Sequence, residues 1–342
     1  MENGQPPLKP RADLVNELMI PTASEGARGL MAALGPAKAA YKLLLASQAA
    51  DREHGPESRE AAGAANDMGV AFFLQDNARS SAEAFGRVLA AAESEDGGAG
   101  GPGLRGPLVN LGISLIELDS HAQALALFRR AFAVEEAGPG PESPEAVGIR
   151  ILVGTTLSAT GEYGEALEVL DAAAEISRRT LGDGHKFTLS AEDEAAVALL
   201  NTEEYGRAQE RHRANLEAAE KAMDASHPFL ILPLTHLAEA LSRAPAGERP
   251  LTEVRGEVVA LLRRAYEVSA KSFGKGSRHT IWLASNLGLA MAERGDQAGG
   301  ERIIRKAQAD LARTVNQSHP YVRSVKKALV RVQSMRNAPR GR

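Results

Sequence analysis

The sequence predicts an all-α protein: an α-solenoid of about seven antiparallel helix pairs, closed by a C-terminal capping helix. Composition is the first observation, because 44% of the 342 residues are hydrophobic and only 4% are aromatic, whereas strands favour aromatic and β-branched side chains. The second is a string that returns: ALFRRAFAV at residues 126–134 becomes ALLRRAYEV at residues 260–268. Similar strings far apart in one chain are typical of structural repeats.

The repeat has a period of 42 or 43 residues. A small residue that follows a hydrophobic one returns at this spacing, with a final step of 50, at Gly69, Gly112, Gly154, Ala196, Ala238 and Gly288. The eight additional residues fit the segment RAPAGERP at 243–250, whose proline and glycine predict an inserted loop. Sixteen residues after the small position a large residue follows in most copies, as at Phe85 and Phe128.

Each unit is predicted to be a helical hairpin. Within residues 162–176, apolar and small residues recur every three or four positions, which places them on one face of a helix. A similar helix precedes this one, and Gly161 between them suits a left-handed turn. The small residues are expected to let the two helices approach closely, while the large residues fill the space between hairpins.

The predicted order of the chain is an N-terminal arm over residues 1–20, the solenoid over residues 21–317, a basic capping helix over residues 318–336 and a tail over residues 337–342. A degenerate first copy of the unit precedes six clearer ones and has three residues in phase, Ala39, Leu43 and Ala46. The capping helix is expected to dock on the last repeat through one apolar face: Val322, Val325, Leu329 and Val332.

The pattern resembles the tetratricopeptide repeat family. Its best copy consists of Leu111, Gly112, Leu115, Ala124, Phe128 and Ala131. The period is longer than the 34 residues usual in that family and is similar to that of kinesin light chains, whose units are joined by a Gly-x-x-His-Pro-like turn. Comparable turns occur here at His185, His227 and His319, while the fourth clear copy departs most, with His212 and Asn215 where Phe and Ala are expected. The resemblance implies a right-handed superhelix with a concave groove.

We expect a protein that is not an enzyme and that holds no cofactor and no metal. There is no cysteine, which excludes disulfides, thiolate metal sites and cysteine nucleophiles. GPGLRG at residues 101–106 matches a dinucleotide fingerprint, but a helix is expected before it, so a flexible linker is predicted. His236 and Glu239 could form an acid/base pair, although no nucleophile accompanies them.

The three turn histidines His185, His227 and His319 are expected to begin first helices rather than to bind a metal. They lie one or more repeats apart, so their rings could not converge on one ion. No apolar run approaches the roughly 18 residues of a membrane span, and the first residues do not resemble a secretory signal. We therefore expect a soluble cytoplasmic protein, with an organelle matrix and any oligomeric state left open.

The resemblance also implies which first-helix positions face the groove, namely those two or three residues before the small residue and one or four after it. The predicted partner-binding groove, with neighbours on the same helices, comprises Asn66, Asp67, Phe73, Asn110, Ile113, Thr155, Asp193, Glu194, His236, Glu239, Trp282 and Asn286. Members of the family that clamp a C-terminal carboxylate place Lys and Arg here, and this chain lacks those bases. Asn side chains can both donate to and accept from the main chain of a peptide. A neutral or basic extended peptide or helix is therefore the expected ligand.

Charge is distributed unevenly along the chain. The net charge is −4, yet the segment from Arg302 to Arg342 has eleven Lys and Arg and one acid, so the rest carries −14. The predicted basic C-terminal surface consists of Arg323, Lys326, Lys327, Arg331 and Arg336. We expect it to be the solvated side of the capping helix, with contact to an acidic protein, RNA or anionic lipid as the alternative.

The predicted function is a non-catalytic scaffold or adaptor for protein–protein interaction, which binds a peptide or helical segment of a partner in the concave groove. Two alternatives stay open. One is a structural subunit or assembly factor of a large complex, such as a ribonucleoprotein, anchored by the basic C-terminus. The other is a ligand-sensing regulator whose superhelical curvature changes when it binds a small peptide.

Overall fold

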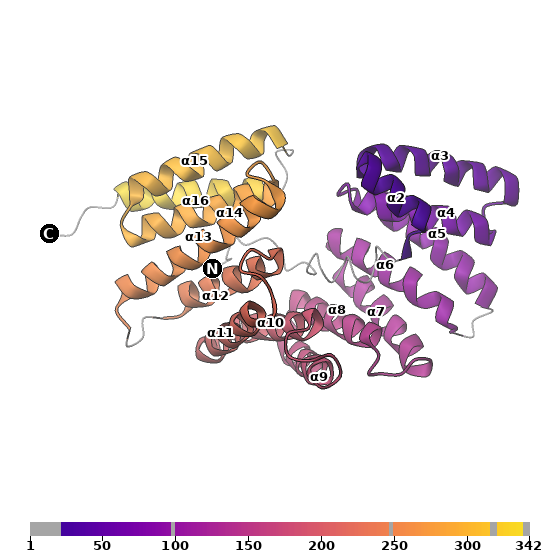
Figure 1. Ribbon diagram of the computed structural model, residues 1–342, viewed down its shortest axis with the longest axis horizontal. Helices are drawn as coiled ribbons and strands as arrows, with labels where there is room; N and C mark the ends of the chain where they lie inside the picture. Colours follow the sequence, from indigo (N-terminus) through magenta and orange to yellow (C-terminus); the bar gives the residue numbers. More distant parts are fainter. Residues whose placement is uncertain (1–21, 97–99, 246–248, 315–319, 338–342) are drawn as a thin grey trace. The chain divides into compact units, whose positions relative to one another are not determined.

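The computed structural model describes residues 22–96, 100–245, 249–314 and 320–337. The predicted N-terminal arm and residues 338–342 of the predicted tail lie outside these ranges. Within them the chain forms fifteen α-helices and two 3₁₀ turns and contains no strand (Figure 1). The all-α prediction is confirmed, and the helices follow one another as seven pairs and a last helix.

The chain divides into two compact units, and the boundary between them in the sequence falls between Ala195 and Ala196. In the N-terminal unit each helix packs against the next one along the chain. Its pairs are α2 (Glu25–Leu34) with α3 (Pro36–His54), α4 (Arg59–Phe73) with α5 (Ala78–Asp96), α6 (Arg105–Glu117) with α7 (His121–Ala137), and α8 (Pro144–Thr160) with α9 (Tyr163–Leu181). Helix α10 (Lys186–Asn201) begins in this unit and ends in the next.

The C-terminal unit continues the same succession. It contains α11 (Tyr205–Ala222), α12 (Ile231–Arg243), α13 (Leu251–Phe273), α14 (Arg278–Arg294), α15 (Gln297–Thr314) and α16 (Pro320–Asn337). Helix α16 packs on both α14 and α15. Its Val322, Val325 and Val332 are buried in one cluster with Ile304 and Leu311 of α15. The predicted docking of an apolar face of the last helix on the last repeat is therefore confirmed.

The small residue at the start of each period allows two helices to approach. A Cβ added to Gly112 would lie 2.5 Å from the Phe128 ring, and one added to Gly69 would lie 2.8 Å from the Phe85 ring. The same relation joins Gly154 to Leu170 and Gly288 to Ile304. In all four copies the large residue is the one sixteen positions later, as the sequence predicted. The period of the sequence thus reflects one contact between the first and second helix that is repeated in each of these four hairpins.

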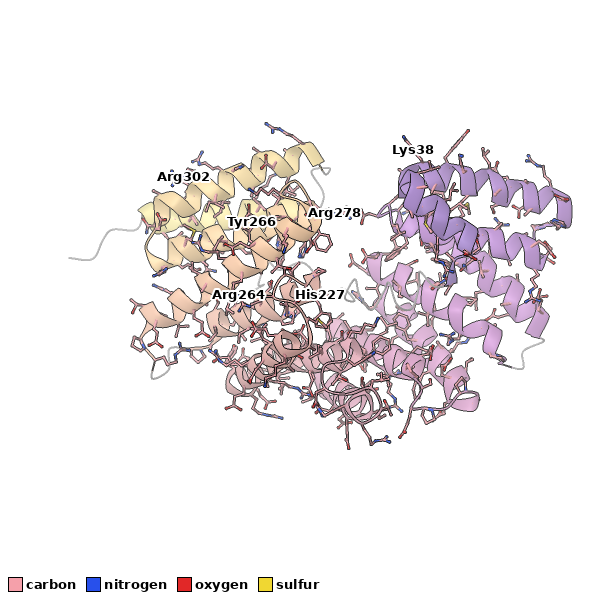
Figure 2. The ribbon with its side chains drawn as sticks, viewed as in Figure 1. Lys38, His227, Arg264, Tyr266, Arg278 and Arg302 are labelled. Atoms are coloured by element: carbon pink, nitrogen blue, oxygen red, sulfur yellow. The ribbon has the colours of Figure 1, made fainter. Side chains whose placement is uncertain are left out.

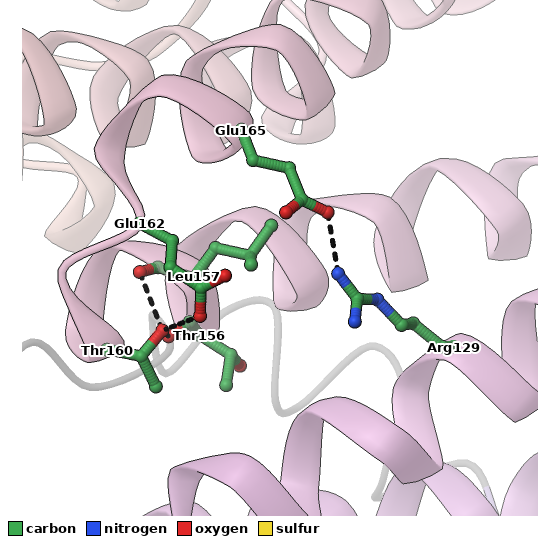
Figure 3. A network of polar contacts seen from close by, with 6 residues as sticks. All are labelled: Arg129, Thr156, Leu157, Thr160, Glu162 and Glu165. Atoms are coloured by element: carbon green, nitrogen blue, oxygen red, sulfur yellow. Dashed lines mark hydrogen bonds and ion pairs between the residues drawn. The ribbon is translucent and has the colours of Figure 1, made fainter.

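A second period lies in the turn between the paired helices. Seven residues after the small position, the backbone takes a positive φ in five copies: Asp76, Asp119, Gly161, Glu203 and Gly295. In the turn that contains Gly161, the Thr160 hydroxyl lies 2.9 Å from both the Leu157 carbonyl oxygen and a Glu162 carboxylate oxygen (Figure 3).

The fifth copy, that of Ala238, has Pro245 at the position that takes a positive φ in the other five. Proline locks φ near −65°, so this hairpin cannot use the short turn. The helices on either side nevertheless keep their phase. Ala238 is buried, and Leu262 and Ala265 are buried at the large and small positions displaced by eight residues. The predicted insertion therefore lies at the tip between α12 and α13, where it lengthens both the connection and the start of α13, which has 23 residues.

We expect Glu203→Gly to stabilise the protein. Glu203 has a φ of 65°, and a left-handed conformation costs an L-residue about 1–2 kcal/mol, which glycine avoids. The expected gain is about 0.5–1 kcal/mol in the free energy of unfolding, because glycine also loses more chain entropy on folding. Urea titration followed by circular dichroism measures it. Glu210→Gly, an exposed position within α11, is the control and should destabilise by about 1 kcal/mol; equal signs for the two variants would contradict the argument.

The two arginines of the repeated string link neighbouring second helices. Arg130 of α7 lies 2.6 Å from Glu93 of α5, and Arg129 lies 2.6 Å from Glu165 of α9 (Figure 3). In the second string, Arg264 of α13 lies 2.6 Å from Glu220 of α11 (Figure 2). Exposed pairs contribute little stability each. The pair of Arg130 with the preceding second helix and the pair of Arg264 with its own preceding second helix are equivalent, so this link between successive hairpins recurs in both strings.

Of the degenerate first copy, Ala39 and Leu43 are buried but Ala46 is exposed. Helix α3 belongs to the first pair of the described chain, so no earlier described hairpin covers this side of the helix. The expectation for Ala46 is therefore wrong, while the other two positions keep the period.

Candidate partner-binding surfaces

The clearest polar site of the N-terminal unit is formed by the first helices α4 and α6. Asn66 of α4 and Asn110 of α6 are 9% and 0% exposed. The Asn110 side-chain amide donates to Asn66 Oδ1 at 3.1 Å. Asp67, next to Asn66, is half-buried. Two successive first helices therefore present two amides and a carboxylate side by side.

The segment Thr22–Ser24, just before α2, occupies this site. Asn66 Nδ2 donates to the Thr22 carbonyl oxygen at 2.8 Å, and Asn110 Nδ2 donates to the Thr22 hydroxyl at 2.8 Å. Asp67 accepts the main-chain N–H of Ser24 at 2.7 Å and the Ser24 hydroxyl at 2.6 Å. The three side chains that the sequence placed in the groove here are thus engaged by a short turn of the same chain, with Thr22 in a 3₁₀ turn and Ala23 in a bend.

Sequence reasoning missed Thr22 and Ser24. They stand about one and two periods before their partners, and only Ser24 carried a local signal, as a residue type that caps helices. Its hydroxyl does accept the N–H of Ala27 at 3.1 Å, as the N-cap of α2. Nothing in the sequence indicates that Thr22 pairs with Asn110, 88 residues away.

Most of the other predicted groove residues are buried. Ile113, Thr155, Asp193 and Glu194 are 1%, 1%, 0% and 3% exposed, and the exposed fraction of Trp282 is 8%. The expectation that these side chains line an open surface is wrong for the described chain. The rule used to choose them takes positions close to the small residue of the first helix, and Ile113, one such position, belongs to the hydrophobic core cluster of the N-terminal unit.

Five predicted positions keep an accessible side chain or part of one. Those that are half-buried are Asp67, Phe73, His236, Glu239 and Asn286. Glu239 of α12 is not an acid/base partner of His236 in this arrangement. It lies 3.3 Å from Arg243, whose guanidinium also donates to Asn201 Oδ1 at 3.1 Å. His236 instead lies near His212, with ring centroids 5.8 Å apart.

The predicted part of the groove on α14 is covered by the last helix. The Trp282 ring stacks on Tyr321 of α16, with centroids 5.5 Å apart and planes inclined by 18°. Trp282 Nε1 also donates to Ser324 Oγ at 3.4 Å. His279 lies beside both rings, and its burial, aided by the charge of Arg278, lowers its pKa to about 4. Helix α16 therefore closes this face as well as the apolar core.

The turn histidines act as predicted where the structure describes them. His185 Nδ1 accepts the N–H of Phe187, and His227 Nδ1 accepts the N–H of Phe229, both at 3.2 Å. His319 lies outside the described residues. No group of three or more His, Asp or Glu side chains that could hold a metal ion is found among the described residues.

The basic C-terminal surface is exposed where its side chains are described. Arg323, Lys326, Lys327 and Arg331 lie on the solvent side of α16, and Arg331 lies 2.5 Å from Glu293 of α14. The side chain of Arg336 lies outside the described part of the chain. In the described ranges, no helix combines the length and the hydropathy needed to cross a membrane.

The segment GPGLRG has the structure of a connection. Pro102–Leu104 forms a 3₁₀ turn that leads directly into α6. Arg105 places its Nε 2.8 Å from Glu135 Oε1 of α7. The helix α5 precedes this segment where a dinucleotide-binding motif needs a strand. The predicted linker, rather than a phosphate site, is what the geometry fits.

Comparisons with known proteins identify the repeat. Family models of the tetratricopeptide repeat match residues 105–179 and residues 281–306. A comparison with curated protein sequences finds no match.

Among solved structures, NprR in complex with its cognate peptide NprX is 14% identical, with 91% of this chain and 84% of that chain covered and a TM-score of 0.56. BtubC (BKLC) from P. vanneervenii is 15% identical, with 70% of this chain and 91% of that chain covered and a TM-score of 0.51. TPR-like repeats ascribed to a kinesin light chain from Podosopora anserina are 19% identical, over 60% of this chain and 94% of that chain, with a TM-score of 0.49. At these identities, the likeness concerns the fold.

Proposed function

Because this chain is a tetratricopeptide-repeat protein, we propose that it is a non-catalytic scaffold or adaptor that holds an extended peptide or a helical segment of a partner against its first helices. The observation that carries the proposal is the site on α4 and α6. There, Asn66 binds a main-chain carbonyl group and Asp67 binds a main-chain N–H group. Those are groups that every extended peptide offers.

The similarity to NprR, which has been solved with its cognate peptide, supports a peptide as the class of ligand. The half-buried Asp67 on α4 supports a neutral or basic segment, since an acidic one would meet like charge. The predicted groove residues Ile113, Thr155, Asp193 and Glu194 are buried and are not accessible to a partner. The surface offered to a partner is therefore narrower than the sequence predicted.

The test is to select binders from a random peptide library displayed on phage, with the whole chain as target, and to map the bound peptide by hydrogen exchange. We expect neutral or basic peptides, and slower amide exchange on α4 and α6. A library that yields no binder would contradict the proposal. Protection confined to α16 would move the binding surface to the basic C-terminus.

The basic surface of α16 supports a second candidate function, attachment to an acidic partner such as RNA or an acidic protein in a larger assembly. Arg323 and Lys327 are exposed there. Neutralising both, as Arg323→Ala with Lys327→Ala, should weaken such attachment and reduce its salt dependence. Arg302→Ala on α15, also exposed (Figure 2), is the matched control. Unchanged binding of a short single-stranded RNA and of an acidic peptide in the double variant would exclude this candidate.

A further inference from the structure

We propose that α4 and α6 form a binding site for a short segment with hydroxyl side chains two residues apart, of the type Thr/Ser-x-Ser, and that this chain's own Thr22–Ser24 occupies it as a competing ligand. The inference rests on the proposed function and specifies both the ligand and its control. It concerns the site formed by Asn66, Asp67 and Asn110, which we call the amide–carboxylate site.

The first argument is the chemistry of the contacts. Two of the four short hydrogen bonds involve main-chain groups of the segment, the Thr22 carbonyl and the Ser24 N–H. The other two involve the Thr22 and Ser24 hydroxyls. Main-chain contacts bind groups that any peptide carries, and the hydroxyl contacts at residues two apart give sequence preference. The residue between them, Ala23, is 3% exposed, so only a small side chain fits there.

The second argument is that the occupant leaves the site incompletely satisfied. Asn110 is fully buried, and its amide nitrogen bonds Thr22 and Asn66. Its Oδ1 has no hydrogen-bond partner among the described residues. A buried acceptor without a donor is unfavourable. A segment that also supplies a donor to Asn110 Oδ1 would therefore bind better than Thr22–Ser24 does.

The third argument is the exposure of one end of the contact. Both Ser24–Asp67 hydrogen bonds lie at the protein surface, where water competes for the same groups. Replacement of the segment can therefore begin at Ser24 and proceed towards Thr22. An intramolecular ligand of this kind raises the concentration of peptide that a partner needs.

The test uses the whole chain and a fluorescent synthetic peptide with the sequence of residues 19–30, MIPTASEGARGL. Thr22→Val with Ser24→Ala in the protein removes both hydroxyls of the intramolecular ligand but leaves the amide–carboxylate site intact. We expect the peptide to bind this double variant at least tenfold more tightly than it binds the wild type, by fluorescence anisotropy. Peptides carrying Val for Thr or Ala for Ser should lose most of that affinity.

Ser58→Ala is the matched control, because Ser58 caps α4 as Ser24 caps α2 but makes no contact with the site in the hydrogen bonds described. It should bind the peptide as the wild type does. Equal affinity of the peptide for the wild type and for the double variant, or no binding to the double variant, would overturn the proposal.

A second measurement covers the case in which the double variant does not fold. Peptides selected from the random library are added to the wild type, and the exchange of the Ser24 amide is followed. Displacement predicts that exchange becomes faster at Ser24 while it slows on α4 and α6. If selected peptides bind and Ser24 exchange is unchanged, this inference fails and the proposed function stands. If no library peptide binds, the proposed function fails first.

Discussion

Gly154→Ala is expected to destabilise the protein by about 1–3 kcal/mol, the usual cost of forcing a methyl group into a packed core. Alanine has a higher helix propensity than glycine by about 1 kcal/mol. Whether the substitution raises or lowers the free energy of unfolding therefore depends on which atoms the new methyl group contacts. It would lie 2.7 Å from Leu170 Cδ2 and even closer to Cγ. Leu170 is itself 0% exposed, and its branch point cannot turn away as the end of a flexible side chain could. The steric term therefore dominates.

Gly63→Ala is the control for this prediction. Gly63 lies within α4 of the same unit, and an added Cβ meets nothing within 4 Å. This variant should be stabilised by about 0.5–1 kcal/mol. Both are measured by urea denaturation with circular dichroism. A Gly154→Ala variant as stable as Gly63→Ala would show that the glycine is not required by the contact.

A double-mutant cycle sharpens the prediction. Leu170→Ala alone should cost about 2–5 kcal/mol, because it leaves a cavity. Combining it with Gly154→Ala puts a methyl group into that cavity, so the double variant should be more stable than the sum of the single effects predicts. Additive effects would place the two residues in separate environments, against the geometry described above.

The second large effect is expected from His279. Its pKa is about 4 in the folded chain, against about 6.5 for an unperturbed histidine. The unfolded chain therefore takes up the proton first as the pH falls. The contribution of His279 to stability is complete above about pH 6.5 and is lost as the pH falls towards 4; it amounts to about 3 kcal/mol at 1.36 kcal/mol per pH unit.

The measurement is the difference between the wild type and His279→Gln, which does not titrate. Unfolding by urea at pH 7, 5.5 and 4 is followed through the fluorescence of Trp282, the single tryptophan of the chain, which lies 5.5 Å from the His279 ring. The stability advantage of the wild type should shrink by about 3 kcal/mol between pH 7 and pH 4. His54→Gln, at an exposed position of α3, should parallel the wild type. A His279→Gln variant that also parallels the wild type would refute the assignment.

The fold could be predicted from the sequence because the spacing of small and large residues reflects a contact between the two helices of a hairpin. Gly112 packs against Phe128, and the same spacing of sixteen residues joins the two helices in three other hairpins. The inserted loop could be predicted because it breaks that spacing. The role of His185 and His227 in the turns could also be predicted, because the hydrogen bond that each ring accepts comes from the main-chain N–H only two residues later.

The candidate site was only partly predictable, because its burial depends on neighbours that the period does not specify. Asn110 was placed on the correct helix face, but the segment that binds it comes from 88 residues earlier and carries no repeat signature. Trp282 was assigned to the groove, whereas Tyr321 of the last helix covers it. Three-dimensional packing decides which neighbouring element covers a side chain. The spacing of residues along the sequence does not carry this information.

The connection between α12 and α13 has a practical consequence. The chain has accepted eight residues there while Leu262 and Ala265 stayed buried in phase, so the hairpin tolerates changes of length at its tip. Tips of this kind are where foreign sequences are best accepted. A short epitope or a fluorophore-binding tetracysteine tag could be inserted after Pro245. Because the chain has no cysteine of its own, the tag would be labelled at this one position, which lies on a different hairpin from the amide–carboxylate site. It would allow ligand exchange at that site to be watched in an otherwise unaltered protein.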